Sequence, residues 1–469
     1  MIELKEPLDK LTRTPQSFTQ GKNFLPPSRI KIYDDTLRDG EQMPGVAFSP
    51  EQKLELAILL SEIGVHVMDV GFPVVSESDR RAIQLCLEAR RRGKIRPEVE
   101  ILAMCRALPG DIDAAVETAT SGGLPPNAVS VLCLSTLSDL HLKYKLGRTL
   151  ARREGEDPER FLELPVEFYR EANLKMITSA ITYAREKGLD KVEFAAEDAS
   201  RSHLEYALPW IEKGFGAGGT RFCFSDTLGC FTPDGVDYYF PPIVEITTKK
   251  GREFHAHFHN DFAMGAANCV RALSHGASHA GVTANGIGER AGNTPLEQVV
   301  MILLCLYGIE LPGFRYERLV ELRRAVEKYS GIPMQPHAPI VGEGVFYHES
   351  GIHTAGISIN PAIYQFIPEE RVGGRRRFVF GKHTGTAAVE EVLRKNAPAL
   401  AKAGVQITED LLKRLVGLVK EIREERIAGG RTESIVRDHY RHYYSLGLSE
   451  EELLELALSR KTELARTQG

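Results

Sequence analysis

A regular alternation of two residue patterns constrains this chain more than any other feature. Short runs of β-branched and apolar residues recur eight times, and amphipathic helical stretches separate them. The runs occupy 30–39, 65–73, 99–107, 127–135, 191–198, 221–226, 253–260 and 279–286. Strands that alternate with helices pair in parallel through helical crossovers. Eight such units predict an α/β fold, a closed (β/α)8 TIM barrel, with an open doubly wound sheet as the alternative.

The helical stretches carry their own boundary signals. Ser49 precedes Pro50 at the start of one pattern, and a serine N-cap followed by proline at the first helical position is typical of a helix that begins there. We therefore expect helices over 50–63 and 168–187, with an additional inserted segment near 138–164.

The alternation stops after about residue 310. Helical patterns then dominate, at 316–329, 386–396, 408–427 and 449–460, around a stretch at 331–385 that is rich in glycine, proline and histidine. We predict three regions: a loose N-terminal extension over 1–27, a catalytic TIM barrel over 28–310, and a mostly helical C-terminal region over 311–469.

The composition argues against two classes of partner. The chain is 42% hydrophobic with a net charge of −5, which is typical of a soluble globular protein and gives no basic surface for nucleic acid or an anionic membrane. No apolar stretch has the length of a membrane span, and the polar N-terminus contains no signal-peptide core, so we expect a cytoplasmic protein. The seven cysteines are odd in number and widely spaced, which indicates reduced thiols.

Three histidines alternate in the seventh run. In a strand, side chains two positions apart share a face, so His255, His257 and His259 point to one side, which in a barrel is the interior. Active sites of TIM barrels form at the C-terminal ends of the strands, where His257 and His259 lie. Two imidazoles there can share one divalent ion. We interpret the deeper His255 as a supporting or core residue.

Neighbouring strand ends supply further ligands. The first run finishes with Arg38 and Asp39, and the glycine-rich turn after the eighth run delivers Asn293. A closed barrel makes strands seven, eight and one consecutive neighbours, so Asp39 and Asn293 can converge with the two histidines on one cation. Such a donor set suits Mg²⁺, Mn²⁺ or a catalytic Zn²⁺. In the alternative interpretation, Asp39 is a helix cap and the turn is a plain tight loop.

Other polar side chains gather at the same predicted mouth. Arg38 is placed to stabilise negative charge that develops on an oxygen. Polar residues also follow the other strands, namely Glu41, Gln42, Asp69, Arg106, Glu197, Asp198, Asp226 and Thr227. We expect several of them to form structural ion pairs.

Five motifs resemble one enzyme family. They are DDTLRDGEQMPG at 34–45, HFHND at 257–261, NGIGERAGN at 285–293, HESGIH at 348–353 and GKHTG at 381–385. Together, and in this order, they resemble the 2-isopropylmalate synthase and homocitrate synthase family of metal-dependent acyltransferases, whose relatives include Re-citrate and citramalate synthases. The resemblance covers the chain from about residue 30 to about residue 390.

The resemblance implies roles for particular residues. The metal ligands would be Asp39, His257 and His259, with Asn293 in or near the shell. The catalytic residues would be Arg38, Glu197, His353 and Tyr364, of which Glu197 and His353 are acid or base and Tyr364 is a helper. Thr227 would hold the carboxylate of a 2-oxo acid. The full set of candidate substrate-binding residues is Arg38, Gln42, Arg106, Thr227 and Ala195.

The reaction implied by the resemblance is a Claisen condensation. A divalent metal would polarise the carbonyl of a 2-oxo acid, a base would remove a proton from the methyl group of acetyl-CoA, and thioester hydrolysis would release CoA and a 2-hydroxy-2-substituted succinate. The family also implies a homodimer, in which the C-terminal region acts as lid and dimerisation element and supplies His353 in trans. No C-terminal regulatory domain is expected, because the chain stops near where one would begin.

Several positions depart from the family pattern and leave the substrate open. Leu132 stands where leucine-pathway members tend to place a histidine, Ala195 replaces a serine, and Glu193 stands where homocitrate synthases tend to place an arginine. The candidates are 2-oxoisovalerate, 2-oxoglutarate, oxaloacetate, pyruvate or a specialised analogue. An acidic distal group would need a cation, and Arg106 is the candidate besides Arg38.

Two other functions remain as alternatives. Metal-dependent carbon–carbon lyases and aldolases, such as hydroxymethylglutaryl-CoA lyase, share the barrel and its metal set. The lyase, however, has a cysteine in its glycine-rich turn, where this chain has Glu289 and Arg290. A barrel that serves only as a binding scaffold would bind no divalent ion.

Overall fold

The computed structural model describes residues 12–13, 18–19, 23–428, 438 and 441. The chain divides into a barrel unit, Thr14–Ser330, and a C-terminal unit that begins at Gly331. The division therefore falls later than the expected end of the barrel region at residue 310.

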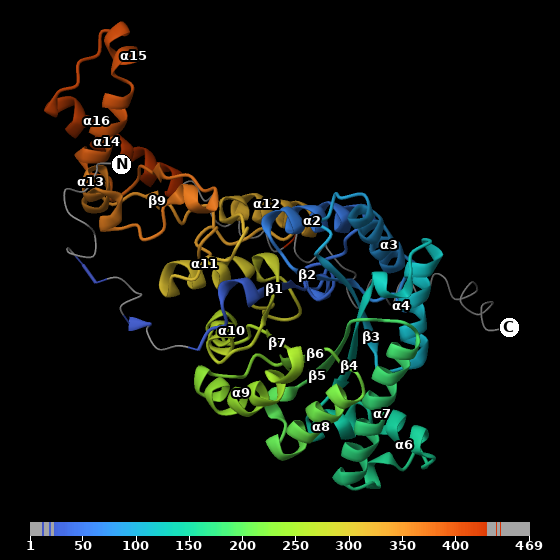
Figure 1. Cartoon of the computed structure of the whole chain (residues 1–469). Coiled ribbons are helices and arrows are strands. Elements are labelled where there is room, and N and C mark those ends of the chain that lie inside the picture. Colours follow the sequence, from blue (N-terminus) through green and yellow to red (C-terminus); the bar gives the residue numbers. More distant parts are fainter. Residues whose placement is uncertain (1–11, 14–17, 20–22, 429–437, 439–440, 442–469) are drawn as a thin grey trace, which may run out of the picture. The chain divides into compact units, whose positions relative to one another are not determined.

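Eight parallel strands close into a barrel in the first unit (Figure 1), which confirms the TIM barrel over the open sheet. The strands pair in chain order and β8 returns to β1. They are β1 (Lys31–Asp34), β2 (Val67–Gly71), β3 (Glu100–Arg106), β4 (Ser130–Thr136), β5 (Val192–Glu197), β6 (Arg221–Asp226), β7 (Glu253–Phe258) and β8 (His279–Val282).

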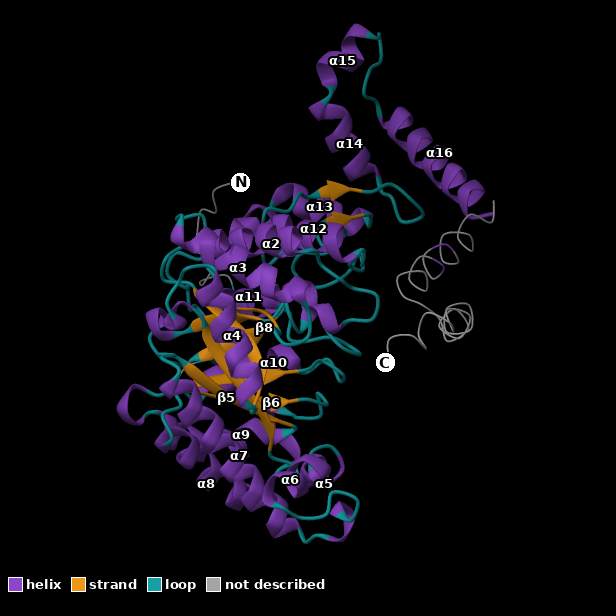
Figure 2. Cartoon of the chain, turned by 90° about the vertical axis from the view of Figure 1, so that its right-hand side faces the viewer, coloured by secondary structure: helices purple, strands orange, loops and turns teal. Residues whose placement is uncertain are grey.

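Helices surround the strands (Figure 2) and cover their outer faces. The crossover helices are α2 (Pro50–Ile63), α3 (Glu77–Arg91), α4 (Pro109–Ser121), α7 (Val166–Glu186), α8 (Leu204–Gly216), α9 (Pro233–Thr247), α10 (Gly265–Ser274) and α11 (Leu296–Tyr307). The insert expected near 138–164 contains α5 (Asp139–Tyr144) and α6 (Gly147–Glu154), which lie between β4 and α7.

Local signals place α2 where the sequence predicts it. The Ser49 hydroxyl accepts from the backbone N–H of Gln52, and the Gln52 side chain accepts from the N–H of Ser49, so a capping box closes the N-terminus. The helix ends at Gly64, whose φ of 125° suits glycine. A Cβ at that position would lie 2.9 Å from the Cα of Phe314.

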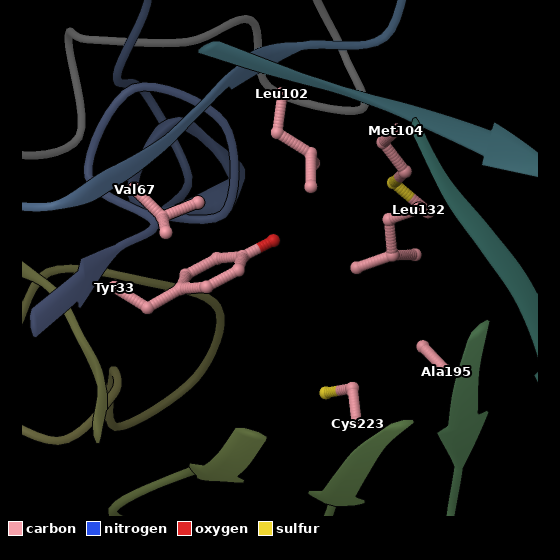
Figure 3. Close-up of a cluster of buried hydrophobic side chains, with 7 residues drawn as sticks. All are labelled: Tyr33, Val67, Leu102, Met104, Leu132, Ala195 and Cys223. Atoms are coloured by element: carbon pink, nitrogen blue, oxygen red, sulfur yellow. The ribbon is translucent and has the colours of Figure 1, made fainter. Parts of the chain in front are cut away.

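An apolar layer fills the middle of the barrel. Figure 3 shows its members, which come from β1 to β6 and point toward the barrel interior: Tyr33, Val67, Leu102, Met104, Leu132, Ala195 and Cys223. Branched and sulfur-containing side chains fill such a layer without leaving a pore. One polar cluster lies at the N-terminal ends of the strands and another at their C-terminal ends, and on the β7 side His255 lies between them, near both Glu193 and His257.

The cluster at the N-terminal ends, which we call the floor, centres on Arg221. This buried guanidinium lies 2.6 Å from Glu193, 2.7 Å from Glu100 and 3.1 Å from Glu253. The second carboxylate oxygen of Glu193 lies 2.8 Å from Nδ1 of His255. The His255 ring also stacks on Tyr33 with centroids 3.9 Å apart. His255 is thus a core residue bound to the floor, as the sequence predicts.

The barrel unit extends past residue 310 because one more helix packs on its outside. Helix α12 (Leu319–Ser330) lies against α2. Arg318, just before it, lies 2.6 Å from Glu62 of α2, and Tyr329 hydrogen-bonds to Glu55. On the N-terminal side, Phe24 packs edge to face on Tyr307 at 5.0 Å, whereas most of the extension predicted over 1–27 lies outside the described residues.

The C-terminal unit is mostly helical, in agreement with the sequence. It contains β9 (Tyr347–His348) paired with β10 (Arg377–Phe378), and the helices α13 (Gly351–Ile359), α14 (Thr386–Lys395), α15 (Ala397–Lys402) and α16 (Glu409–Ala428). The helix predicted at 449–460 lies outside the described residues. In the described part of the chain, no helix is both long and apolar enough to traverse a bilayer, and the seven cysteines are free.

Candidate metal centre and pocket

A helical turn, and not the end of a strand, carries Arg38 and Asp39. The sequence prediction that the first strand runs to Asp39 is wrong, because β1 ends at Asp34. The Asp34 carboxylate accepts from the N–H and the hydroxyl of Thr36, and the Asp35 carbonyl accepts from the N–H of Asp39 at 2.8 Å. These local bonds coil the chain after the strand and bring the Asp39 side chain back over the barrel mouth.

Asp39, His257 and His259 converge as predicted. Oδ2 of Asp39 lies 3.3 Å from Nε2 of His257 and 3.9 Å from Nε2 of His259. One donor atom from each residue lies within 4.8 Å of the other two, and all three side chains are buried. Neighbouring strands β7, β8 and β1 bring together residues more than two hundred positions apart in the sequence.

The protonation of this cluster follows from its charges. Burial alone would lower the pKa of His257, but hydrogen bonds to Asp35 and Asp39 raise it to about 10. Burial and the neighbouring His257 lower the pKa of His259 to about 4. Despite burial, Arg38 and His257 hold the pKa of Asp39 well below its usual range. The cluster thus offers one ionised carboxylate and one neutral imidazole, and a cation would replace the proton on His257.

The donor set fits a divalent ion on two further observations. Nδ1 of His257 lies 3.1 Å from Oδ2 of Asp35, and a carboxylate behind a ligating histidine is the usual way to orient its ring. Nδ1 of His259 and Oδ1 of Asn293 are buried with no hydrogen-bond partner among the described residues. Asn293 lies beside His259, paired by an antiparallel bridge. Its free carbonyl oxygen is the kind of donor that a hard cation takes.

The glycine-rich turn at 285–293 fixes the position of Asn293. The N–H of Asn293 donates to the Gly286 carbonyl at 3.1 Å, and a Cβ at Gly292 would lie 2.0 Å from that same oxygen. Arg290 also joins this turn to two other loops, since its guanidinium donates to Asp261 at 2.8 Å and to the Thr227 carbonyl at 2.6 Å.

Arg38 is bound by carboxylates on three sides. Its Nε lies 2.7 Å from Asp69, and its terminal nitrogens lie 3.5 Å from Asp35 and 3.7 Å from Asp39. The guanidinium is therefore fixed beside Asp39, and Arg38 also lines the adjacent pocket.

A pocket of about 270 Å³ opens at the cluster formed by Asp39, His257 and His259. One side is polar and includes Arg38, Gln42, Thr227 and Glu289 beside the cluster. The opposite side, from β3, β4, β5 and β6, is mainly apolar, with Met104, Leu132, Leu134, Ala195 and Cys223. A small molecule that bound the cation would therefore meet a mainly apolar wall, whose charged members Glu197 and Lys145 form an ion pair with each other.

Glu197 and Thr227 border the pocket where the sequence places them. Glu197 ends β5, and its carboxylate lies 2.5 Å from Nζ of Lys145. The Thr227 hydroxyl accepts from the N–H of Asp198 at 2.8 Å. Gln42 and Ala195 also line the pocket.

Arg106 does not lie with the other predicted substrate-binding residues. Its Nε and Nη2 donate to the two oxygens of Asp111, at 2.8 Å and 3.0 Å, and it is not among the described residues that line the pocket. Asp111 lies at the start of α4, where its carboxylate also accepts from the backbone N–H of Arg106.

His353 and Tyr364 belong to the C-terminal unit. Their rings stack with centroids 4.2 Å apart, and both side chains are exposed on that unit. The two residues implied as catalytic partners are therefore brought together, His353 from α13 and Tyr364 from just after a short helical turn at Pro361–Ile363.

Four polar residues of the site were not predicted from the sequence. Asp35 orients His257, and Lys145, Ser225 and Glu289 line the pocket. Asp35 was visible in the acidic pair at 34–35, and Ser225 lies on β6 two positions before Thr227, which follows that strand. Lys145 lies in the insert after β4, where no strand pattern marks it.

Comparisons with known proteins cover most of the chain. The family described as HMGL-like matches residues 29–154 and 158–326, and the family described as homocitrate synthase post-HMGL domain-like matches residues 340–427. Homocitrate synthase AksA of Methanopyrus kandleri is 38% identical over 88% of this chain and 93% of its own length. Putative (R)-citramalate synthase CimA of the same organism is 37% identical over 88% and 73%. A probable 2-isopropylmalate synthase of Ignicoccus hospitalis is 38% identical over 85% and 94%.

Proposed function

Because the chain belongs to the HMGL-like family and continues into a homocitrate synthase post-HMGL domain-like region, we propose that it condenses acetyl-CoA with a small 2-oxo acid. The products are CoA and a 2-hydroxy-2-substituted succinate. The observation that carries this proposal is the convergence of Asp39, His257 and His259, with Arg38 beside them, at the base of a pocket.

The residues of the barrel would bind and orient the 2-oxo acid. Asp39, His257 and His259 would hold the metal, with Asn293 as an additional oxygen donor. A divalent ion at this site would act as a Lewis acid toward the substrate carbonyl. Thr227 would hold the carboxylate. The fixed guanidinium of Arg38 would stabilise the negative charge that develops on the carbonyl oxygen.

Proton transfer needs groups on both units of the chain. We assign the removal of a proton from the acetyl-CoA methyl to His353, with Tyr364 as its stacked partner. Glu197 is the acid or base on the barrel side. We propose a homodimer in which His353 of one subunit serves the barrel of the other.

The pocket favours a compact 2-oxo acid. Its volume of about 270 Å³ and its apolar wall at Met104, Leu132 and Ala195 limit the size of the substituent. The three relatives are named for different products, so substrate choice is the question that an assay must answer. A lyase reaction is disfavoured, since these relatives are named as synthases and the glycine-rich turn has Glu289 and Arg290.

The direct test is thiol release from acetyl-CoA. Purified protein is assayed with pyruvate, 2-oxoisovalerate, oxaloacetate and 2-oxoglutarate, with added Mg²⁺, Mn²⁺ or Zn²⁺ and with a chelator. We expect metal-dependent release of CoA with at least one of the acids. Mass spectrometry should then detect the corresponding condensed product. Absence of release with every acid and metal would refute the proposed function.

A substitution tests the role of His353. We expect His353→Ala to lower kcat by about a hundredfold, the range for loss of a general base. Mixing His353→Ala with Asp39→Ala subunits should restore about a quarter of the activity, because random exchange makes half the dimers mixed with one intact site each. Unchanged activity of His353→Ala would contradict the assignment, and no recovery on mixing would contradict its supply in trans.

A further inference from the structure

We infer that Lys145 is a positioning residue of this site, whose ammonium group holds the Glu197 carboxylate at the edge of the pocket. The inference rests on the proposed function for what Glu197 does in catalysis. The contact itself is short, 2.5 Å between Nζ of Lys145 and Oε2 of Glu197, and both residues line the pocket.

Helix α5, whose C-cap residue is Lys145, is firmly anchored. Ser138 caps α5 by accepting from the N–H of His141, and Asp139 forms two hydrogen bonds with Arg170 of α7, at 2.7 Å and 2.8 Å. Leu142 is fully buried beneath the helix. The N–H of Lys145 donates to the His141 carbonyl at 3.0 Å, so the backbone of the lysine has a fixed position.

The same segment also fixes the backbone of Glu197. Its carbonyl accepts from the Thr136 hydroxyl at 2.8 Å and from the N–H of Leu137 at 3.1 Å. Lys145 therefore binds the side chain of a residue whose main chain is already tied to the β4–α5 connection. Lys145 contacts Oε2 of Glu197, so the other carboxylate oxygen, Oε1, is not taken by the ammonium group.

The other charged groups near Glu197 are engaged elsewhere or too distant to hold its carboxylate. Arg38, the other lysine or arginine among the described residues of the pocket, is bound by carboxylates of its own. Asp198, next to Glu197, is paired with Arg201 at 2.7 Å. His141 lies 3.7 Å from Glu197 and 3.6 Å from Asp198, too far for a hydrogen bond to either.

Removal of the ammonium should misplace Glu197 without disturbing the metal. A displacement of about 1 Å at a catalytic group costs about a hundredfold in rate. We expect Lys145→Met to lower kcat by about thirtyfold to a hundredfold, while KM for the 2-oxo acid stays within about twofold. Lys145→Arg should recover part of kcat, and added ethylammonium should partly rescue Lys145→Ala, because the side chain is 51% exposed.

The matched control is Lys143→Met, which removes a lysine of the same helix that is not among the described residues of the pocket. It should keep full activity. A rise in KM for the 2-oxo acid at constant kcat in Lys145→Met would overturn the inference, because it would make Lys145 a direct substrate ligand. An equal loss in Lys143→Met, or no loss in Lys145→Met, would overturn it as well.

A second measurement does not depend on activity. Crystal structures of the wild type and of Lys145→Met should show the Glu197 carboxylate in different positions, with Asp39, His257 and His259 unmoved. An unchanged Glu197 would overturn the inference even if the enzyme proved inactive with every 2-oxo acid. Inactivity of the wild type would refute the proposed function alone.

Discussion

The two ends of the barrel interior differ in how their buried acidic groups are paired with basic groups. At the floor, Arg221 contacts three carboxylates, one of which, Glu100, also binds Lys191 at 2.7 Å. At the mouth, the carboxylates of Asp35, Asp39 and Asp69 surround the single guanidinium of Arg38. Once a cation replaces the proton on His257, basic groups match the acids at the floor more closely than at the mouth.

Two carboxyl groups show the effect of this difference. Burial opposes ionisation at Glu100, but Arg221 and Lys191 lower its pKa to about 2. At Asp69, burial and the like charge of Asp35 outweigh Arg38 and raise the pKa to about 7. A floor that neutralises its own charges serves the fold, whereas an excess of negative charge at the mouth is suited to a cation.

The largest effect should come from Asp39→Ala at the mouth. Loss of the carboxylate removes the anionic donor shared by both histidines, so we expect stoichiometric metal binding to disappear and activity to fall by at least about a thousandfold. Equilibrium dialysis with metal analysis measures the first, and the thiol assay the second. Retained stoichiometric binding would show that the ligand set is wrong.

The next effect concerns the floor. Arg221→Leu removes the cation that Glu100 and Glu193 share and leaves these buried carboxylates with Lys191 and His255 alone, which should lower the free energy of unfolding by about 3–5 kcal/mol. Metal affinity of the folded protein should stay unchanged. Urea unfolding measures the first quantity and metal titration the second.

A surface pair gives the matched control for that substitution. Arg91→Leu removes a guanidinium from an exposed pair with Glu88 and should lower the free energy of unfolding far less than Arg221→Leu does. Equal losses in the two variants would mean that the floor does not stabilise the fold. A loss of metal affinity in Arg221→Leu would mean that the two ends are not independent.

The smallest effect is the pH dependence of the metal-free protein. The folded-state pKa of Glu100 lies below its ordinary value, so its stabilisation is present above about pH 4.5 and is lost as pH falls toward about 2. The folded-state pKa of Asp69 is raised, so its ionisation costs stability as pH rises from about 4 to about 7. The two contributions have opposite signs, so they partly cancel between pH 2 and pH 7.

Difference curves separate the two contributions. The gap between wild type and Glu100→Gln should shrink on acidification below pH 4.5, whereas the gap between wild type and Asp69→Asn should grow from pH 4 to pH 7. Chemical unfolding at each pH measures both. If the stability of the wild type relative to each variant changed in the same direction with pH for both variants, the contrast between floor and mouth would be contradicted.

The sequence predicts the fold well because the alternation of patterns reports burial directly. All eight strands lie within the predicted runs or one residue from them, and barrel closure then brings Asp39 to the two histidines. The end of β1 is not predictable in this way, because the chain turns on hydrogen bonds of Asp34 and Thr36 that hydrophobic periodicity does not reflect.

The remaining site residues depend on pairings between separate elements. Arg106 follows a strand, yet Asp111 on the next helix takes its guanidinium. Lys145 reaches Glu197 from an inserted helix whose packing no strand pattern reveals. His353 and Tyr364 are identifiable through family resemblance alone, since they lie outside the barrel.

The crowded glycine turn at 285–293 has a consequence for how such an enzyme can diversify. Gly286 and Gly292 admit no larger residue, so these positions next to Asn293 cannot accept single substitutions without distortion of the turn. The opposite half of the mouth, with Met104, Leu132 and Ala195, presents ordinary strand positions whose side chains can be exchanged singly. New substrates can therefore be explored on one side of the barrel while the chemistry is inherited intact on the other.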